Sequence, residues 1–256
     1  PLNELSYIRL LDTWRDPEPP FEAMREEFAV RFFSTIPEKS IPYRPSRVEP
    51  TILNKRYHPF DYTYNVVSRV HTGTERVWRQ ADELHPDKKR ELARYLEIEL
   101  PEEFREVFDS FLEEAYDEDA GYYERIDGIL KNYSTFQYEL GFDDNVHVEK
   151  LHRFLGTTKS GDCTEFSNTA AVLGRMAGIP SRVVTGYLAS RGLQTFAHIR
   201  GLFELQRMIE PLQAYPLESL FLVTTAHHHS WVQYYLPGYG WVDFETTATA
   251  IPPPMS

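Results

Sequence analysis

The sequence predicts an α+β fold, in which a buried helix at residues 162–177 packs on an antiparallel β-hairpin at residues 226–247. The helix is predicted by apolar residues at helical spacing, between a clear start signal and a clear stop signal. The hairpin is predicted by two runs of strand-forming residues on either side of the turn sequence Pro-Gly-Tyr-Gly. Strand-like alternation at residues 61–70 adds a β-containing N-terminal extension.

The bulk composition describes a globular chain of one large domain or two smaller ones, with 256 residues. The 39 acidic against 27 basic residues give a net charge of −12, which argues against nucleic-acid binding. A single cysteine excludes an internal disulfide and a paired-cysteine metal site. No apolar run is long enough to span a membrane. Because the chain opens with Pro1, we expect an excised segment whose flanks could hold membrane helices.

The N-terminal region differs in composition from the rest of the chain. Residues 1–80 are expected to form a small β-containing subdomain, residues 81–250 the principal domain, and residues 251–256 a Pro-rich tail that begins a linker. Within residues 21–34, strand and helix patterns compete. The strand alternation uses Phe28, Val30 and Phe32, whereas helical spacing joins Phe21, Met24, Phe28 and Phe32. The strand at 61–70 is clearer, with Tyr62, Tyr64, Val66 and Val70 on one face.

The middle of the chain predicts a series of helices. Pro86 and Pro101 stand where a first helical turn tolerates proline, so helices are expected over 85–98 and 101–115. A third helix is expected over 122–133 and a short one over 147–157, with a strand at 134–140 between them.

The only cysteine lies at the start of the predicted buried helix. Asp162 can cap the helix, and Glu165 completes a capping box, while Gly178 and Pro180 end it. A lone cysteine is often a small buried hydrophobe. In the first turn, however, the helix dipole and free N–H groups lower the pKa of the Cys163 thiol and can help to hold an oxyanion.

The predicted hairpin supplies the partners that a nucleophilic thiol needs. In the run of three histidines, His227 and His229 are expected on one strand face and His228 on the other. If residues 236–240 form the loop, Glu245 becomes the diagonal neighbour of His229. Asp243 then lies further along the strand and is the less favoured acid, although a bulge would reopen the choice.

These residues stand in motifs that resemble the transglutaminase-like superfamily of papain-type thiol enzymes. The stretches are "GDCTEFSNTAAVLGRMAGIPSRVVTGY" and "HHSWVQYYLPGYGWVDFETT". The resemblance implies a papain-like core, with Cys163 as nucleophile, His229 as its base and Glu245 at the acid position. The family usually has Asp followed by Pro-Thr there, so Glu245-Thr246-Thr247 departs from its pattern. The upstream stretches "RYLEIELPEEFREVFDSFLEEA", "YSTFQYEL" and "VEKLHRFLGTTKSGDC" resemble bacterial membrane-anchored members, which implies an extracytoplasmic domain; a cytoplasmic location stays open.

The resemblance implies acyl transfer on protein or peptide amides, without a cofactor or metal. The acyl group of the thioester would pass to water, as in a cysteine protease or amidase, or to an amine, as in a cross-linking transglutaminase. We favour hydrolysis because water is always available. A non-catalytic scaffold is the alternative from another class, and a metal-dependent hydrolase centred on the three histidines is a further one.

Two features of the sequence have more than one interpretation. Gln137 and Tyr138 are candidates, by location alone, for the second oxyanion donor. The insertion at residues 191–220 is expected to be either a helix on the core or a lid over the thiol.

Overall fold

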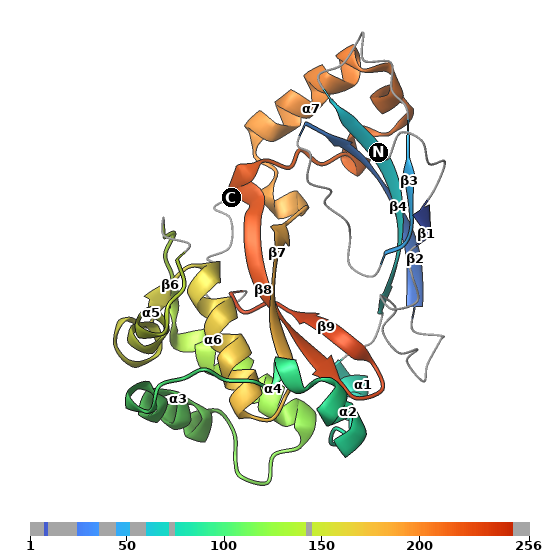
Figure 1. Ribbon diagram of the computed structural model, residues 1–256. Coiled ribbons are helices and arrows are strands. Elements are labelled where there is room, and N and C mark those ends of the chain that lie inside the picture. The colour runs from blue at the N-terminus through green and yellow to red at the C-terminus, as the bar shows by residue number, and fades with distance from the viewer. Residues whose placement is uncertain are drawn as a thin grey trace. The chain divides into compact units, whose positions relative to one another are not determined.

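The computed structural model describes residues 8–9, 25–35, 45–51, 60–71, 75–141 and 145–247 (Figure 1). The chain divides into two compact units. The first contains the N-terminal strands together with Leu188–His227, and the second contains Thr74–Tyr187 and the chain from His228 onward. The predicted domain boundaries stay a prediction, and the Pro-rich tail at 251–256 lies outside the described residues.

A four-stranded antiparallel sheet forms the first part of the N-terminal unit. It consists of β1 (Ile8–Arg9), β2 (Arg25–Ser34), β3 (Pro45–Pro50) and β4 (Tyr62–His71), in the order β1-β3-β4-β2. The ambiguous segment is therefore a strand, because β2 pairs with β4 along its whole length. Phe32 stacks on Tyr64 with ring centroids 4.9 Å apart. Phe21 and Met24, which suggested a helix, lie outside the described residues.

The insertion belongs to this first unit and contains a helix, α7 (Phe196–Met208). Three short 3₁₀ turns follow it, at Glu210–Ala214, Leu217–Ser219 and Thr225–His227. Leu202, Ile209 and Leu212 are buried, so the segment has a small apolar core. Whether the insertion acts as core or as a lid stays a prediction.

The second unit begins with a series of helices, the first of which the sequence did not predict. They are α1 (Glu75–Trp78), α2 (Pro86–Glu91), α3 (Glu102–Ala115), α4 (Tyr122–Asn132) and α5 (Val148–Arg153). Pro86 occupies the first turn of α2 as expected, and Pro101 is the N-cap of α3. The strand predicted at 134–140 is shorter: a 3₁₀ turn takes up Tyr133–Thr135, and only β5 (Gln137–Tyr138) pairs, in parallel, with β6 (Ser160–Gly161).

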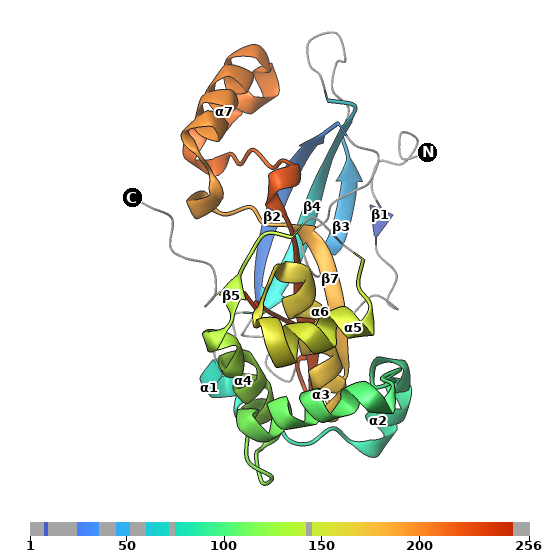
Figure 2. The same cartoon turned by 90° about the vertical axis from the view of Figure 1, so that its left-hand side faces the viewer.

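The centre of this unit is a helix packed on an antiparallel sheet. The helix is α6 (Cys163–Met176), and the sheet has the order β7 (Ser181–Tyr187), β8 (His228–Leu236), β9 (Gly240–Phe244). Figure 2 shows α6 lying across this sheet with α5 beside it. A Cβ at Gly174 would lie 2.4 Å from the Tyr234 ring, so glycine is required for this close approach. No described helix is long and apolar enough to cross a membrane.

The hairpin has the predicted register but a later start. Tyr235 pairs with Trp241 as predicted, but Leu236 also pairs with Gly240, so the turn is shorter than expected and comprises residues 237–239. Strand β8 begins only at His228, so the prediction that His227 and His229 lie on the same face of a strand is wrong. The 3₁₀ turn takes up His227, whose ring Nδ1 accepts a hydrogen bond from the Thr224 N–H (3.0 Å).

Candidate active site

The first turn of α6 is held by hydrogen bonds that fix the position of Cys163. The Asp162 carboxylate accepts from the Thr164 N–H (2.8 Å), and the Glu165 carboxylate accepts from the Asp162 N–H (2.9 Å). This is the capping box that the sequence predicts. Glu165 also forms a nearly buried ion pair with Lys150 on α5 (2.6 Å). The thiol therefore stands on an anchored helix end rather than on a loose loop.

His229 enters the same region from β8 and is buried, with 4% of its surface exposed. Its Nε2 lies 2.8 Å from Oε2 of Glu245. The other carboxylate oxygen, Oε1, accepts from the Thr247 N–H (2.8 Å) and the Thr247 hydroxyl (2.6 Å). Both oxygens of Glu245 are therefore engaged, and the imidazole keeps Nδ1 for the thiol. The contribution of Thr247 escaped the sequence analysis, although its place two residues after the acid was the available signal.

The electrostatics of these three groups favour a thiolate beside an imidazolium. Burial raises the pKa of the Cys163 thiol, but hydrogen bonds with His229 and Ser230 outweigh it, so the pKa lies below its usual value. Burial lowers the pKa of His229, yet hydrogen bonds and charge interactions with Cys163 and Glu245 raise it to about 9. Burial of Glu245 is likewise outweighed, chiefly by its hydrogen bonds to His229 and Thr247, and its pKa is lowered.

Ser230 joins the helix to the strand directly behind the thiol. Its hydroxyl donates to the backbone carbonyl of Cys163 (2.8 Å), and its oxygen lies 2.9 Å from the hydroxyl of Ser167, one helical turn further along α6. Ser230 is 4% exposed. This clamp was missed in the sequence, where the serine was visible only as the residue after the candidate histidine.

Tyr138 is the candidate oxyanion donor that the structure brings to Cys163. It pairs with Gly161, two residues before the cysteine, and its phenol interacts electrostatically with Cys163. Burial, followed by the charge of Cys163, raises the pKa of Tyr138 to about 12, so the phenol keeps its proton at neutral pH. Gln137 is exposed and precedes Tyr138 on the strand, so the two side chains point to opposite faces.

Asp243, the alternative acid, has other partners. Its Oδ1 accepts hydrogen bonds from the Trp231 indole (2.6 Å) and from the Gln233 amide (2.7 Å). The geometry thus pairs His229 with Glu245, as the hairpin register predicts.

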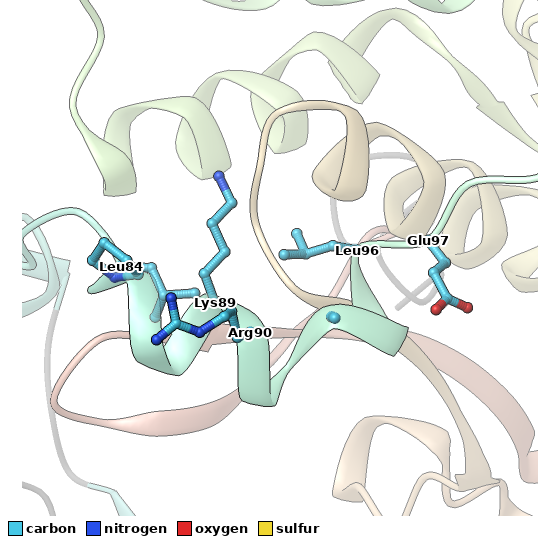
Figure 3. Close-up of a pocket in the computed structure, with 7 residues that line it drawn as sticks. Leu84, Lys89, Arg90, Leu96 and Glu97 are labelled. Carbon is cyan, nitrogen blue, oxygen red and sulfur yellow. The ribbon is translucent and has the colours of Figure 1, made fainter.

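The run of three histidines and a surface pocket differ from this constellation. Among the described residues, no group of three or more potential ligands could hold a metal ion, and the His228 ring instead packs edge-on against Tyr187. A wide-open pocket lies over α2 and the turn that follows it (Figure 3), and none of the candidate catalytic residues lines it. Its lining residues are Leu84, Pro86, Lys89, Arg90, Ala93, Leu96 and Glu97.

A helix that carries a cysteine in its first turn, packed on an antiparallel sheet that carries a histidine and an acid, defines the papain-like class of folds. The sequence pattern of the transglutaminase-like superfamily matches residues 114–246. The chain belongs to this superfamily.

Two of the relatives of the chain are proteins from Bacillus subtilis and Pseudomonas aeruginosa. The chain is 30% identical to the Bacillus subtilis protein YebA over 63% of its own length, and 29% identical over 47% of its length to a Pseudomonas aeruginosa protein named protein-glutamine gamma-glutamyltransferase. It spans only 18% and 15% of these two proteins. The crystal structure of the periplasmic domain of TgpA from Pseudomonas aeruginosa has the same fold, with a TM-score of 0.52 and 18% identity over 93% of this chain and 74% of that one.

Proposed function

We propose that this chain is the catalytic domain of a thiol acyl-transfer enzyme that acts on amide groups of proteins or peptides. The observation that carries the proposal is the 2.8 Å contact between His229 Nε2 and Glu245, beside a thiol whose pKa is lowered by His229. Cys163 is the nucleophile, His229 the acid and base, and Glu245 the group that orients the imidazole.

The reaction follows from these positions. The Cys163 thiolate attacks the amide carbonyl, and the carbonyl π electrons move onto oxygen. The His229 imidazolium then gives its proton to the departing nitrogen as the C–N bond breaks, which leaves a thioester on Cys163 and a neutral imidazole. The imidazole next takes a proton from the incoming nucleophile, which displaces the thiolate and restores the ion pair.

Water is the acceptor that we favour, which makes the enzyme a cysteine protease or amidase. Transfer to an amine is the second candidate, and it is favoured by the name of the Pseudomonas aeruginosa relative, a protein-glutamine gamma-glutamyltransferase. Both reactions pass through the same thioester, so they differ only in whether water or an amine attacks it.

The test separates these functions by their products. Purified protein is incubated with glutamine-containing peptides, with and without a primary amine, and the products are identified by mass spectrometry; Cys163→Ala is the matched control. Hydrolysis of the backbone gives peptide fragments, and hydrolysis of the glutamine side chain gives glutamate, in which an oxygen replaces an NH. Transfer gives the amine adduct. If a broad peptide library shows neither product and an electrophilic amide probe does not label native Cys163, the chain is a non-catalytic scaffold and the proposal fails.

We infer an extracytoplasmic location in a bacterial membrane protein. The likeness to the periplasmic domain of TgpA supports it. A fusion of the full-length protein to a reporter active only outside the cytoplasm is expected to give signal, and signal from a cytoplasm-only reporter would contradict the inference.

The pH dependence of the thiol is expected to differ from that of a free cysteine. Because the pKa of Cys163 is lowered and that of His229 is raised to about 9, thiolate and imidazolium coexist between the two values. Alkylation of the native protein should already be fast at pH 7, below the usual thiol pKa of about 8.5. Turnover should fall above about pH 9, where the imidazole loses the proton that it donates. An alkylation rate that rises steeply between pH 8 and 9 in the native protein, as in unfolded protein, would contradict the assignment.

Tyr138 is proposed as the second oxyanion donor, beside the backbone N–H groups at the start of α6. Replacing Tyr138 with Phe keeps the ring but removes the hydroxyl that interacts electrostatically with Cys163. Turnover should fall about 10²-fold or more, as for other oxyanion donors, while KM changes little. Gln137→Ala is the matched control, because this neighbouring side chain is exposed. Equal activity of Tyr138→Phe and wild type would remove Tyr138 from the mechanism.

A further inference from the structure

We propose that Asp243 and Gly186 are positioning residues that hold the indole of Trp231 beside the imidazole of His229. This inference rests on the proposed function, since its consequence is measured on the Cys163–His229 pair. It assigns a role to the carboxylate that the sequence offered as the competing catalytic acid.

The indole and the imidazole lie next to each other on β8. Their ring planes differ by 20°, and the ring centroids are 6.3 Å apart. His229 and Trp231 are two residues apart, so both side chains stand on the same face of the strand. Ring centroids about 4.5–7 Å apart are typical of interacting aromatic pairs, so the indole packs beside the imidazole.

Asp243 fixes the indole from the neighbouring strand β9. The indole Nε1–H donates to its Oδ1 at 2.6 Å. The same oxygen accepts from the Gln233 amide at 2.7 Å, and the Gln233 carbonyl in turn accepts from Nε of Arg182 at 2.7 Å. The Arg182 guanidinium lies 4.2 Å from the centroid of the Trp241 ring. The carboxylate therefore accepts hydrogen bonds from both Trp231 and Gln233, and it gives the indole an anchor.

Gly186 makes room for the indole on the opposite side, on β7. It is the register partner of His229 across the strand pair. A Cβ at this position would lie 3.0 Å from Cη2 and 3.4 Å from Cζ3 of Trp231. Its backbone is extended, so alanine would be tolerated by the strand but would push the ring. The glycine thus serves the placement of Trp231 rather than a turn.

The arrangement stabilises the imidazolium form of His229 and limits rotation of its ring. Loss of the anchor should let the indole leave the imidazole, so the thiolate–imidazolium pair should persist over a narrower pH range. A change that acts only on the fold would lower the amount of folded protein without moving that range.

The experiment compares Asp243→Ala, Asp243→Asn and Trp231→Phe, with Asp119→Ala as a matched control on an exposed loop carboxylate. The rate of Cys163 alkylation and the rate of turnover are measured from pH 5 to 10, and thermal unfolding reports the folded fraction. Asp243→Ala should lower kcat about tenfold with KM nearly unchanged, and should move the alkaline limb of turnover below that of wild type. Asp243→Asn keeps an acceptor oxygen for the indole and should restore most of kcat.

Gly186→Ala provides an independent arm, because it moves the indole without touching the carboxylate. It should shift the alkaline limb in the same direction as Asp243→Ala, and Trp231→Phe should make both changes silent. If Asp243→Ala and Trp231→Phe keep the wild-type pH profile, the positioning role is wrong. The proposed function fails separately, if wild-type Cys163 alkylates like a free thiol.

Discussion

Replacement of Cys163 with alanine is expected to remove turnover almost completely, by a factor that can reach about 10⁶ where a nucleophile works as one unit with its base. Alanine keeps the first turn of α6, because the capping box is made by Asp162 and Glu165. The fold should therefore persist, and only the attacking atom is lost. Peptide turnover, thermal unfolding and labelling by an electrophilic amide probe measure these effects together.

The companion experiment uses His229. His229→Ala should cost nearly as much as Cys163→Ala, since the thiolate then loses the hydrogen bond and charge that lower its pKa. The double variant should be no slower than either single one, because the two groups act in the same step. Substantial turnover by folded Cys163→Ala would mean that this thiol is not the nucleophile.

Replacement of Glu245 with glutamine is expected to produce the second large effect. Glutamine keeps the size of the side chain but loses the charge that stabilises the imidazolium, and it can present an N–H where His229 Nε2 now meets a carboxylate oxygen. Turnover should fall on the order of 10² or more, since a comparable change in a serine triad costs about 10⁴. The alkaline limb of turnover should also move down, because charge from Glu245 contributes to the raised pKa of His229.

Asp243→Asn is the matched control for Glu245→Gln, since both remove one carboxylate charge from the same end of the hairpin. It should have a much smaller effect, because asparagine has no charge but still offers an oxygen to Trp231 and Gln233. The opposite ranking of the two variants would overturn the assignment of Glu245.

The sequence was sufficient for the parts of the fold that depend on local signals. The capping box at Asp162 and Glu165 could be predicted because both partners lie within one helical turn. The register that brings Glu245 to His229 could be predicted because a short turn fixes the pairing of the two strands. In each case the residues that decide the structure are neighbours in the chain.

The remaining features depend on partners that are far apart in the sequence. His227 lies in a 3₁₀ turn, where its ring Nε2 is 3.3 Å from the carbonyl oxygen of Leu193, 34 residues earlier, so the expected alternation with His229 does not apply. Ser230 contacts Cys163 and Ser167, which lie more than 60 residues away in the sequence, and no local sequence pattern predicts these contacts. The insertion groups with the N-terminal strands, and long-range grouping of this kind is invisible to local periodicity.

The Ser230 clamp has a consequence for how the enzyme would pay the entropic cost of assembling its catalytic groups. Ser230 follows His229 directly, and its hydroxyl holds the backbone of Cys163, so the proposed nucleophile and the proposed base are tethered to each other before any substrate arrives. A preorganised pair needs little reorganisation on the way to the transition state. Binding energy from the substrate is then free to lower the barrier of the chemical step instead of ordering the residues that carry it out.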